Sequence, residues 1–258
     1  MPAINPWKPS ISKEVAFFAR LVKILLLFKM GDRAERETGE RKGYLINVTA
    51  ETKEMLRRTK FVKELGGEHV MVDILTAGWA EVQTLRGECE GLKLAIHTHR
   101  AFHAAFTRNP KHGVSMLAVA KIARLQGVDQ IHVDTSIGKL ESSKAEVLAL
   151  QKAITGKMVK GNERILSQYW GTIKPVFPVS SGGLHPGLIP QIVSMLGRDI
   201  IVWVGGGVWG HPDGGRTGAV AVRQAIDAAL NGVPLDERAK NKKELKAVLG
   251  KWGYIRPK

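Results

Sequence analysis

Three histidines and an arginine crowd into one short stretch of the chain, "LAIHTHRAFHAAF" (94–106). The chain has eight histidines, and His97, His99 and His103 fall within seven positions, with Arg100 among them. The residues before His97 predict a buried strand, and His97 and His99 share one side of it because side chains alternate along a strand. Titratable and cationic groups at a strand end favour an anionic ligand.

The H-x-H spacing of His97 and His99 also suits a metal ion. Metal-dependent hydrolases with barrel folds use such a pair, and His132 and Asp73 could complete the ligand set. Arg100 lies directly beside the pair, and a cation at that place suits an anion better than a metal. A hydrolase therefore remains an alternative.

Two glycine runs and one loop lysine add to the predicted anion site. The runs are "VSSGGLH" (179–185) and "VGGGVWGHP" (204–212), and each follows an apolar run and precedes a predicted helix. Backbone N–H groups converge on an anion where no Cβ obstructs them, and a helix N-terminus favours negative charge. The loop "DTSIGKLE" (134–141) carries Lys139, which a mobile lid could bring to a developing negative charge.

These groups lie at the ends of six short runs rich in β-branched residues, which predict strands. Helical patterns separate the runs, so the sequence predicts βαβ units and a parallel sheet. Chemistry at six successive strand ends favours a barrel over a doubly wound sheet, which binds ligands at one switch point. We therefore expect an α/β fold, a (β/α) barrel of the TIM type that is incomplete, with six of the eight βα units recognisable. The predicted strands are 44–50, 69–75, 93–99, 129–135, 175–181 and 200–206. The predicted helices are 51–65, about 80–90, 113–126, 141–155, 187–196 and 216–230.

Composition narrows the function classes. The 258 residues are 44% hydrophobic, enough for a full core, and a single cysteine, Cys89, allows no intramolecular disulfide. A reducing, cytoplasmic setting is therefore expected. The most apolar stretch, residues 15–30, is interrupted by Arg20 and Lys23, so it predicts an amphipathic helix and no membrane span.

The net charge of +15 lies mainly at the two ends of the chain. Residues 1–30 carry five Lys or Arg and one Glu, and residues 238–258 carry eight Lys or Arg and one Glu. Basic ends are more typical of solvated surface than of a nucleic-acid groove, so nucleic acid is not an expected partner. A non-catalytic protein whose basic ends bind nucleic acid stays a further alternative.

Five ordered strings give the chain a family resemblance. They are "ETGERKGYLINVTAET", "HTHRAFHAAFTRNPKHG", "DQIHVDTSIGKLE", "KPVFPVSSGGLHPG" and "VGGGVWGHPDGGRTGAVAVRQA". Together they resemble the large subunit of ribulose-bisphosphate carboxylase (RuBisCO), in an archaeal form, over about residues 33–235. The resemblance implies a barrel preceded by a smaller α+β domain, with active sites formed between two subunits.

The resemblance also implies roles for individual residues. His99 resembles the proton-handling histidine, and Lys139 resembles the mobile-loop lysine that stabilises the carboxylated intermediate. Arg100 and His132 resemble the groups that hold one phosphate of the sugar bisphosphate. The positions that match the cradle of the substrate and its other phosphate are Ser181, Gly182, Gly183, Gly205 and Gly206.

One departure from the family pattern bears on activity. The family binds Mg²⁺ through a carbamylated lysine, an aspartate and a glutamate in a "K-x-D-E"-like run, and no such run occurs here. We therefore expect no metal ligands in this chain, and binding of ribulose bisphosphate without carboxylation by the chain alone. The expected organisation is a divergent, helical segment 1–32, a partial barrel 33–235 and a basic tail 236–258. A homo-oligomer or a missing N-terminal part is the expected partner, since unpaired strand edges recruit other chains.

Overall fold

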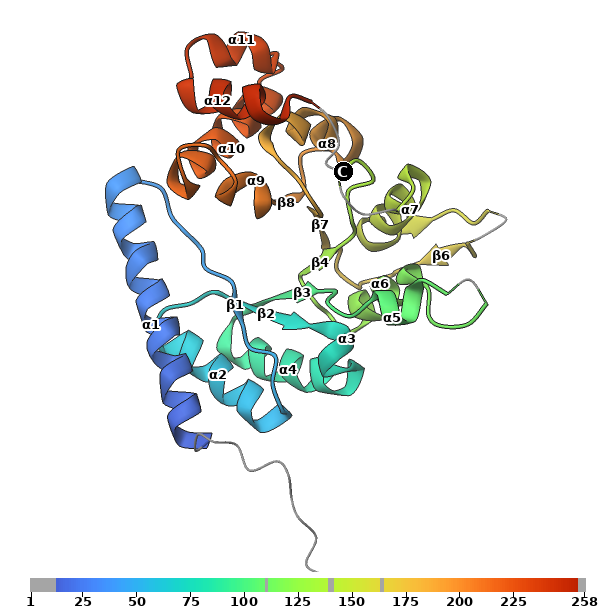
Figure 1. Cartoon of the computed structure of the whole chain (residues 1–258). Coiled ribbons are helices and arrows are strands. Elements are labelled where there is room, and N and C mark those ends of the chain that lie inside the picture. The colour runs from blue at the N-terminus through green and yellow to red at the C-terminus, as the bar shows by residue number, and fades with distance from the viewer. Residues whose placement is uncertain (1–12, 110, 139–141, 163–164, 255–258) are drawn as a thin grey trace, which may run out of the picture.

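Six parallel strands form the centre of the fold (Figure 1). The structure, a computed structural model, describes the backbone of residues 13–109, 111–138, 142–162 and 165–254, and side chains from residue 24 onward. The strands lie side by side in chain order, and each neighbouring pair is parallel. They are β1 (Ile46–Asn47), β2 (His69–Asp73), β3 (Ala95–His99), β4 (Gln130–His132), β7 (Phe177–Ser181) and β8 (Ile201–Trp203).

Each of the six predicted runs contains one of these strands, so the predicted α/β fold with a partial barrel is confirmed. The helices that follow the strands begin within three residues of the predicted starts. Ser115 caps α6 by accepting from the Ala118 N–H, and Ser143 caps α7 by accepting from the Glu146 N–H. The helices are α1 (Lys13–Thr38), α2 (Thr52–Glu64), α3 (Ile74–Ala77), α4 (Trp79–Leu92), α5 (Ala104–Thr107), α6 (Met116–Leu125), α7 (Lys144–Thr155), α8 (Ile189–Leu196), α9 (Gly206–Trp209), α10 (Gly215–Leu230), α11 (Leu235–Lys240) and α12 (Lys243–Trp252).

Side-chain alternation divides the strands between an apolar and a polar face. Val70, Ile96 and Ile131 are fully buried in the main hydrophobic core, which the helices of the βα units complete. The residues after Ile96 and Ile131 are His97 and His132, which contact each other instead. The apolar face therefore fixes the sheet against its helices, and the opposite face carries the histidines.

Helix α1 runs along one side of the molecule, beside β1 (Figure 1). The ring of Phe28 on α1 packs edge-on against Tyr44, with centroids 6.4 Å apart. At the other end of α1, Glu37 pairs with Arg216 of α10 at 3.0 Å. The helix thus lies beside β1 and reaches α10. Within the described residues, β1 and β8 are the outer strands of the sheet, and each pairs on one side only.

Other segments complete the described chain. A two-stranded antiparallel hairpin, β5 (Met158–Val159) and β6 (Gln168–Tyr169), follows α7. Residues 235–252 form α11 and α12, which pack on α10 around a second small core. Among the described helices, none combines the length and apolar character needed to cross a membrane.

Arg124 of α6 is a buried cation without a carboxylate partner among the described residues. It is 1% exposed, and its guanidinium donates hydrogen bonds to the backbone carbonyls of Ala153, Gly156, Ile173 and Lys174. The carbonyl groups at the end of α7 and before β7 are thereby satisfied by one side chain.

Candidate functional site

Four of the chemically active side chains stand on the last residues of neighbouring strands. Asp73 ends β2, His99 ends β3, His132 ends β4 and Ser181 ends β7. Since these strands are parallel neighbours, the four residues meet at one edge of the sheet. The carboxyl ends of the strands are where a (β/α) barrel places its active site.

His99 is oriented by a carboxylate. Its Nδ1 lies 2.6 Å from Oδ1 of Asp73, while the Asn47 amide donates to Oδ2 of Asp73 at 3.0 Å. The Asp73 backbone N–H donates to the Thr49 hydroxyl at 2.8 Å. With Nδ1 held by Asp73, the Nε2 atom of His99 is left to accept or donate a proton in the site.

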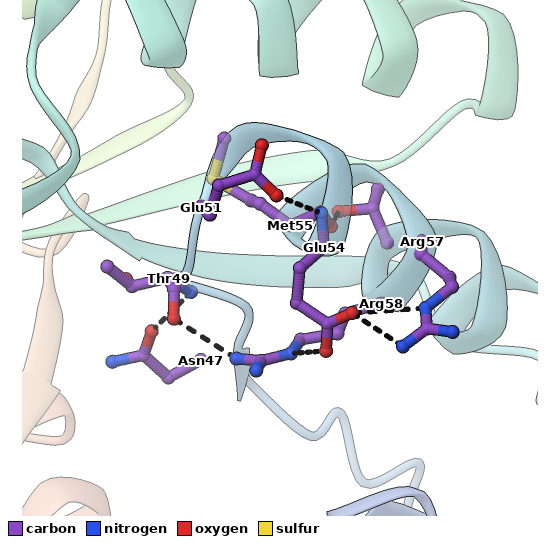
Figure 2. A network of polar contacts seen from close by, with 8 residues as sticks. Asn47, Thr49, Glu51, Glu54, Met55, Arg57 and Arg58 are labelled. Carbon is purple, nitrogen blue, oxygen red and sulfur yellow. Dashed lines mark hydrogen bonds and ion pairs between the residues drawn. The ribbon is translucent and has the colours of Figure 1, made fainter. Parts of the chain in front are cut away.

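The end of β1 and the residues after it, which carry Asn47 and Thr49, are held in place by side chains of α2, as Figure 2 shows. Arg58 of α2 donates to the Thr49 carbonyl at 3.1 Å and to the Glu54 carboxylate at 2.9 Å. Burial of the Glu54 carboxyl acts to raise its pKa, but hydrogen bonds from Arg58 and Arg57 outweigh this effect and lower the pKa. The ionised carboxylate and the 6%-exposed Arg58 therefore fix the end of β1 where it contacts Asp73.

A row of hydrogen-bonded side chains runs from Gln130 on β4 to His97 on β3, back to His132 on β4 and on to Ser181 on β7. Gln130 Oε1 lies 2.7 Å from His97 Nδ1, and His97 Nε2 lies 2.9 Å from His132 Nε2. His132 Nδ1 lies 2.7 Å from the Ser181 hydroxyl. Burial lowers the pKa of His97, and burial with the nearby His97, His99 and Arg100 lowers the pKa of His132 to about 2. Both rings are therefore neutral at pH 7.

Trp203, the last residue of β8, covers the histidines. Its ring centroid lies 5.2 Å from that of His97, 5.3 Å from that of His132 and 6.5 Å from that of His99. The indole shields the ring pair from solvent and supports its low pKa values. Trp203 was not predicted from the sequence, and its place in the middle of the run "IIVWVGG", shortly before the glycines, was the available signal.

The guanidinium of Arg100 forms an ion pair with Asp134. Its Nη2 lies 2.7 Å from Oδ2 of Asp134, and both side chains are nearly fully buried. The same Asp134 oxygen accepts from the Ser142 hydroxyl at 2.6 Å. The resemblance implies that Arg100 holds a phosphate, which stays a prediction; in the structure Asp134 pairs with the guanidinium and fixes it in place.

One pocket collects most of the predicted residues. Its volume is about 340 Å³, and His99, Arg100, His132, Ser181 and Gly182 are in its wall. The other lining residues are Ala101, Phe102, His103, Ala104 and Trp203. His103 is half-buried, and burial lowers its pKa.

The remaining predicted residues lie elsewhere. Gly183, Gly205 and Gly206 do not line this pocket. Space around Gly205 and Gly206 is open, because a methyl group added at either Cα atom would meet no other atom within 4 Å. Lys139 lies outside the described residues.

Glycine at 182 and 183 has a conformational cause. Both residues have positive φ, 113° and 70°, a region that other residues rarely adopt. Gly138 approaches so closely that a Cβ there would overlap the Gly182 carbonyl oxygen. The turn after β7 and the loop after β4 are thus packed backbone against backbone beside the pocket.

The donor set does not fit a metal. No group of three or more His, Cys, Asp or Glu side chains capable of holding a metal ion is found in the part of the chain that the structure describes. Both ring nitrogens of His97 already have protein partners, so His97 and His99 do not present two free nitrogens to one ion. Asp73, the nearest carboxylate, is engaged by His99 and Asn47. Mg²⁺, which prefers several oxygen ligands, finds no such set among the described residues.

Comparison with known proteins gives one family. The sequence model of the family "Ribulose bisphosphate carboxylase large chain, catalytic domain" matches residues 13–252, beyond the range 33–235 covered by the five strings. A ribulose bisphosphate carboxylase of Pyrococcus abyssi is 50% identical over 236 residues, which are 92% of this chain and 53% of that protein. The enzyme of Methanosarcina mazei is 52% identical over 230 residues, 88% of this chain and 54% of that protein.

Solved structures agree. The dimeric archaeal Rubisco of Hyperthermus butylicus superposes with a TM-score of 0.82 at 54% identity, over 88% of this chain and 53% of that one. The octameric Rubisco of Pyrococcus horikoshii also gives a TM-score of 0.82, at 49% identity, over 92% of this chain and 54% of that one. The chain therefore spans about half the length of the relatives it matches.

Proposed function

The chain belongs to the ribulose bisphosphate carboxylase large-chain family, and on that premise we propose that it binds ribulose bisphosphate at the carboxyl ends of β3, β4 and β7. The observation that carries this proposal is the pocket of about 340 Å³ that gathers His99, Arg100, His132, Ser181 and Gly182. A guanidinium, a hydroxyl, ring nitrogens and a glycine turn together suit a phosphorylated sugar.

Each group has a distinct part in the proposed complex. The pocket brings Ser181 and the Gly182 turn, which the resemblance assigns to the other phosphate, beside Arg100 and His132, so the proposal places all four at one phosphate. Asp134 holds the Arg100 guanidinium in place there. His99 handles a proton of the sugar at Nε2, because Asp73 holds Nδ1. Lys139, which lies outside the described residues, keeps the role that the resemblance implies for it. Gly183, Gly205 and Gly206 form the second phosphate site, where open space around the last two glycines admits a ligand.

Carboxylation by this chain alone is not part of the proposal. The family's Mg²⁺ would polarise the sugar's oxygens, and the described residues do not fit that ion. What remains is recognition of an anion and orientation of a proton-carrying histidine. The expected behaviour is binding without turnover.

We also propose that the chain works with a second polypeptide, either another copy or a chain that supplies further strands. Each of β1 and β8 pairs on one side only within the described residues. A cavity of about 690 Å³ lies at these strands and is lined by Leu27, Tyr44, Met71 and Trp203, among others. An exposed strand edge beside an apolar cavity favours addition of a strand.

Isothermal titration with ribulose bisphosphate tests the binding proposal. We expect saturable binding, weakened roughly tenfold or more by Ser181→Ala, because a hydrogen bond to a charged group contributes about 1.5–3 kcal/mol. Ser167→Ala is the matched control, since Ser167 lies beside β6 and accepts from the Gly161 N–H, away from the pocket. Binding that is absent, or equal in both variants, would contradict the proposal.

A radiolabelled-bicarbonate assay with Mg²⁺ tests the second half of the proposal. We expect no fixation by the isolated chain. Fixation that Lys139→Ala abolishes would mean that the chain obtains its metal ligands in a way the described residues do not reveal. The two assays are independent, since the first measures binding and the second measures chemistry.

A further inference from the structure

Four side chains on three neighbouring strands form one continuous row of hydrogen bonds. The row begins at Gln130, passes through His97 and His132, and ends at Ser181 in the wall of the pocket. Its three contacts measure 2.7, 2.9 and 2.7 Å. His97, His132 and Ser181 are each less than 10% exposed, so water does not replace any of these contacts at the rings.

Two neutral rings in such a row can be arranged in only two ways. A neutral imidazole carries one N–H and one acceptor nitrogen, and the 2.9 Å contact between the two Nε2 atoms needs one hydrogen between them. If His132 donates it, His97 has its proton on Nδ1, and His132 Nδ1 accepts from the Ser181 hydroxyl. If His97 donates it, His132 has its proton on Nδ1 and donates to Ser181.

The two arrangements differ at both ends of the row. In the first, Gln130 accepts through Oε1, the orientation that the structure has, and the Ser181 O–H is used inside the protein. In the second, the Gln130 amide is turned and donates through Nε2, while the Ser181 O–H is free to point into the pocket. A phosphate has only acceptor oxygens, so it favours the second arrangement.

The charged alternative is disfavoured by the surroundings. An imidazolium in this row would lie in a buried place with Arg100 and His99 close by, and burial already lowers the pKa of both rings. Asp134, the nearest carboxylate to Arg100, is engaged by that guanidinium and by Ser142. The row therefore carries two neutral rings at pH 7.

We propose that Gln130 is a positioning residue that sets, through His97 and His132, whether Ser181 donates or accepts a hydrogen bond in the anion pocket. The proposal rests on the proposed function in one respect, that Ser181 faces a phosphate. Gln130 does not line the pocket, and it acts only through the two rings. Its backbone pairs with β3 opposite His97, which places the amide beside the ring.

Exchange between the arrangements conserves protons. Solvent supplies one proton to His132 Nδ1 from the pocket side, and the shared proton passes from His132 Nε2 to His97 Nε2. His97 Nδ1 releases its proton to solvent when the half-buried Gln130 side chain turns its amide and opens that contact. The Ser181 hydroxyl keeps its own proton and turns it toward the anion. Neither an oxidant nor a metal is needed.

Nitrogen-15 spectra of histidine-labelled full chain measure the tautomers directly, with His97→Phe and His132→Phe used for assignment. Without anion, we expect His97 protonated on Nδ1 and His132 on Nε2. Titration with inorganic phosphate should shift both rings together, to Nε2–H on His97 and Nδ1–H on His132.

A variant at the far end of the row gives the decisive result. Gln130→Met removes the acceptor for His97 Nδ1–H, and a buried N–H without a partner is less tolerable than a bare acceptor. The variant should therefore show His132 as the Nδ1–H tautomer before any phosphate is added, and phosphate should then cause no further tautomer shift. Gln126→Met is the matched control, because Gln126 donates to the Trp79 carbonyl outside the row.

Three results would overturn the proposal: His132 keeping its Nε2–H tautomer in Gln130→Met, the two rings changing independently, or either ring being an imidazolium at pH 7. If Gln130→Met does not fold, the wild-type titration still decides, since saturating phosphate that changes the tautomer of neither ring contradicts the proposed coupling. Failure of the proposed function looks different. In that case phosphate would leave the chemical shifts of the backbone amides of 181–183 unchanged. The comparison of wild type and Gln130→Met without anion would still test whether Gln130 sets the tautomers of His97 and His132.

Discussion

Acidification is expected to weaken this fold through its buried histidines. His97 is fully buried and His132 is 2% exposed. Burial lowers the pKa of both, that of His132 to about 2, whereas a histidine in the unfolded chain has a pKa of about 6.5. Below pH 6.5 the unfolded chain therefore binds protons that the native chain does not, and the free energy of unfolding falls as the pH falls.

The size of this effect follows from the difference between the two pKa values. One pKa unit corresponds to about 1.36 kcal/mol, so lowering the pH from 8 to 5 removes about 2 kcal/mol of stability through His132 alone. His97 acts in the same direction. The loss continues until the pH approaches the folded-state pKa near 2. Carboxylates with lowered pKa values, such as Glu54, lose their contribution only below about pH 4.5, so histidines dominate this range.

Urea unfolding at pH 8 and pH 5, at constant ionic strength, measures the difference. His132→Gln should be less stable than wild type at pH 8. Its unfolding free energy should, however, fall by about 2 kcal/mol less than that of wild type when the pH is lowered from 8 to 5. His112→Gln should keep that difference, because His112 is exposed. Equal unfolding free energies of the wild-type chain at the two pH values would refute the reasoning, since they would require His132 to be protonated in the native state.

Three further outcomes are expected. Arg124→Met should lower the unfolding free energy in urea by about 3–5 kcal/mol, because four carbonyl hydrogen bonds and a 4.3 Å cation–π contact with Trp170 are lost; a loss under 1 kcal/mol would contradict the assigned role. Gly138→Ala should cost about 1–3 kcal/mol and weaken bisphosphate binding, since its methyl group would overlap the Gly182 carbonyl; unchanged calorimetry would count against this contact. Cys89 is fully buried and burial raises its pKa to about 12, so iodoacetamide at pH 8 should label it only after unfolding.

The architecture could be predicted from the sequence because it depends on local patterns. The β-branched runs gave all six strands of the sheet, and alternation along "LAIHTH" correctly placed His97 and His99 on one side. The hairpin β5–β6 was missed, since strands of two residues carry too little pattern to detect. That the site residues meet at the carboxyl ends of the strands could be predicted because neighbouring strands are parallel.

The polar partners within the site could not be predicted, because they depend on residues far apart in the chain. Asp134 lies 34 positions after Arg100, and nothing local marks it as the partner of that guanidinium. Arg124 resembles an ordinary surface charge on a helix, yet it is buried and satisfies carbonyls from Ala153 to Lys174. Such pairs form only when loops from different strands meet, and the sequence does not specify that geometry.

The pocket lies mostly on interior strands of the sheet and not on its outer strands, β1 and β8. Its strand residues His99, His132 and Ser181 stand on β3, β4 and β7, which form consecutive parallel pairs within the sheet. Trp203 on β8 is the one lining residue at an edge strand, and β7 holds that strand through Val179, Ser180 and Ser181. The shape of the pocket thus depends mainly on interior pairings, and Trp203 is where it meets an outer strand. The second polypeptide proposed at those edges would add groups to the site without having to build this pocket.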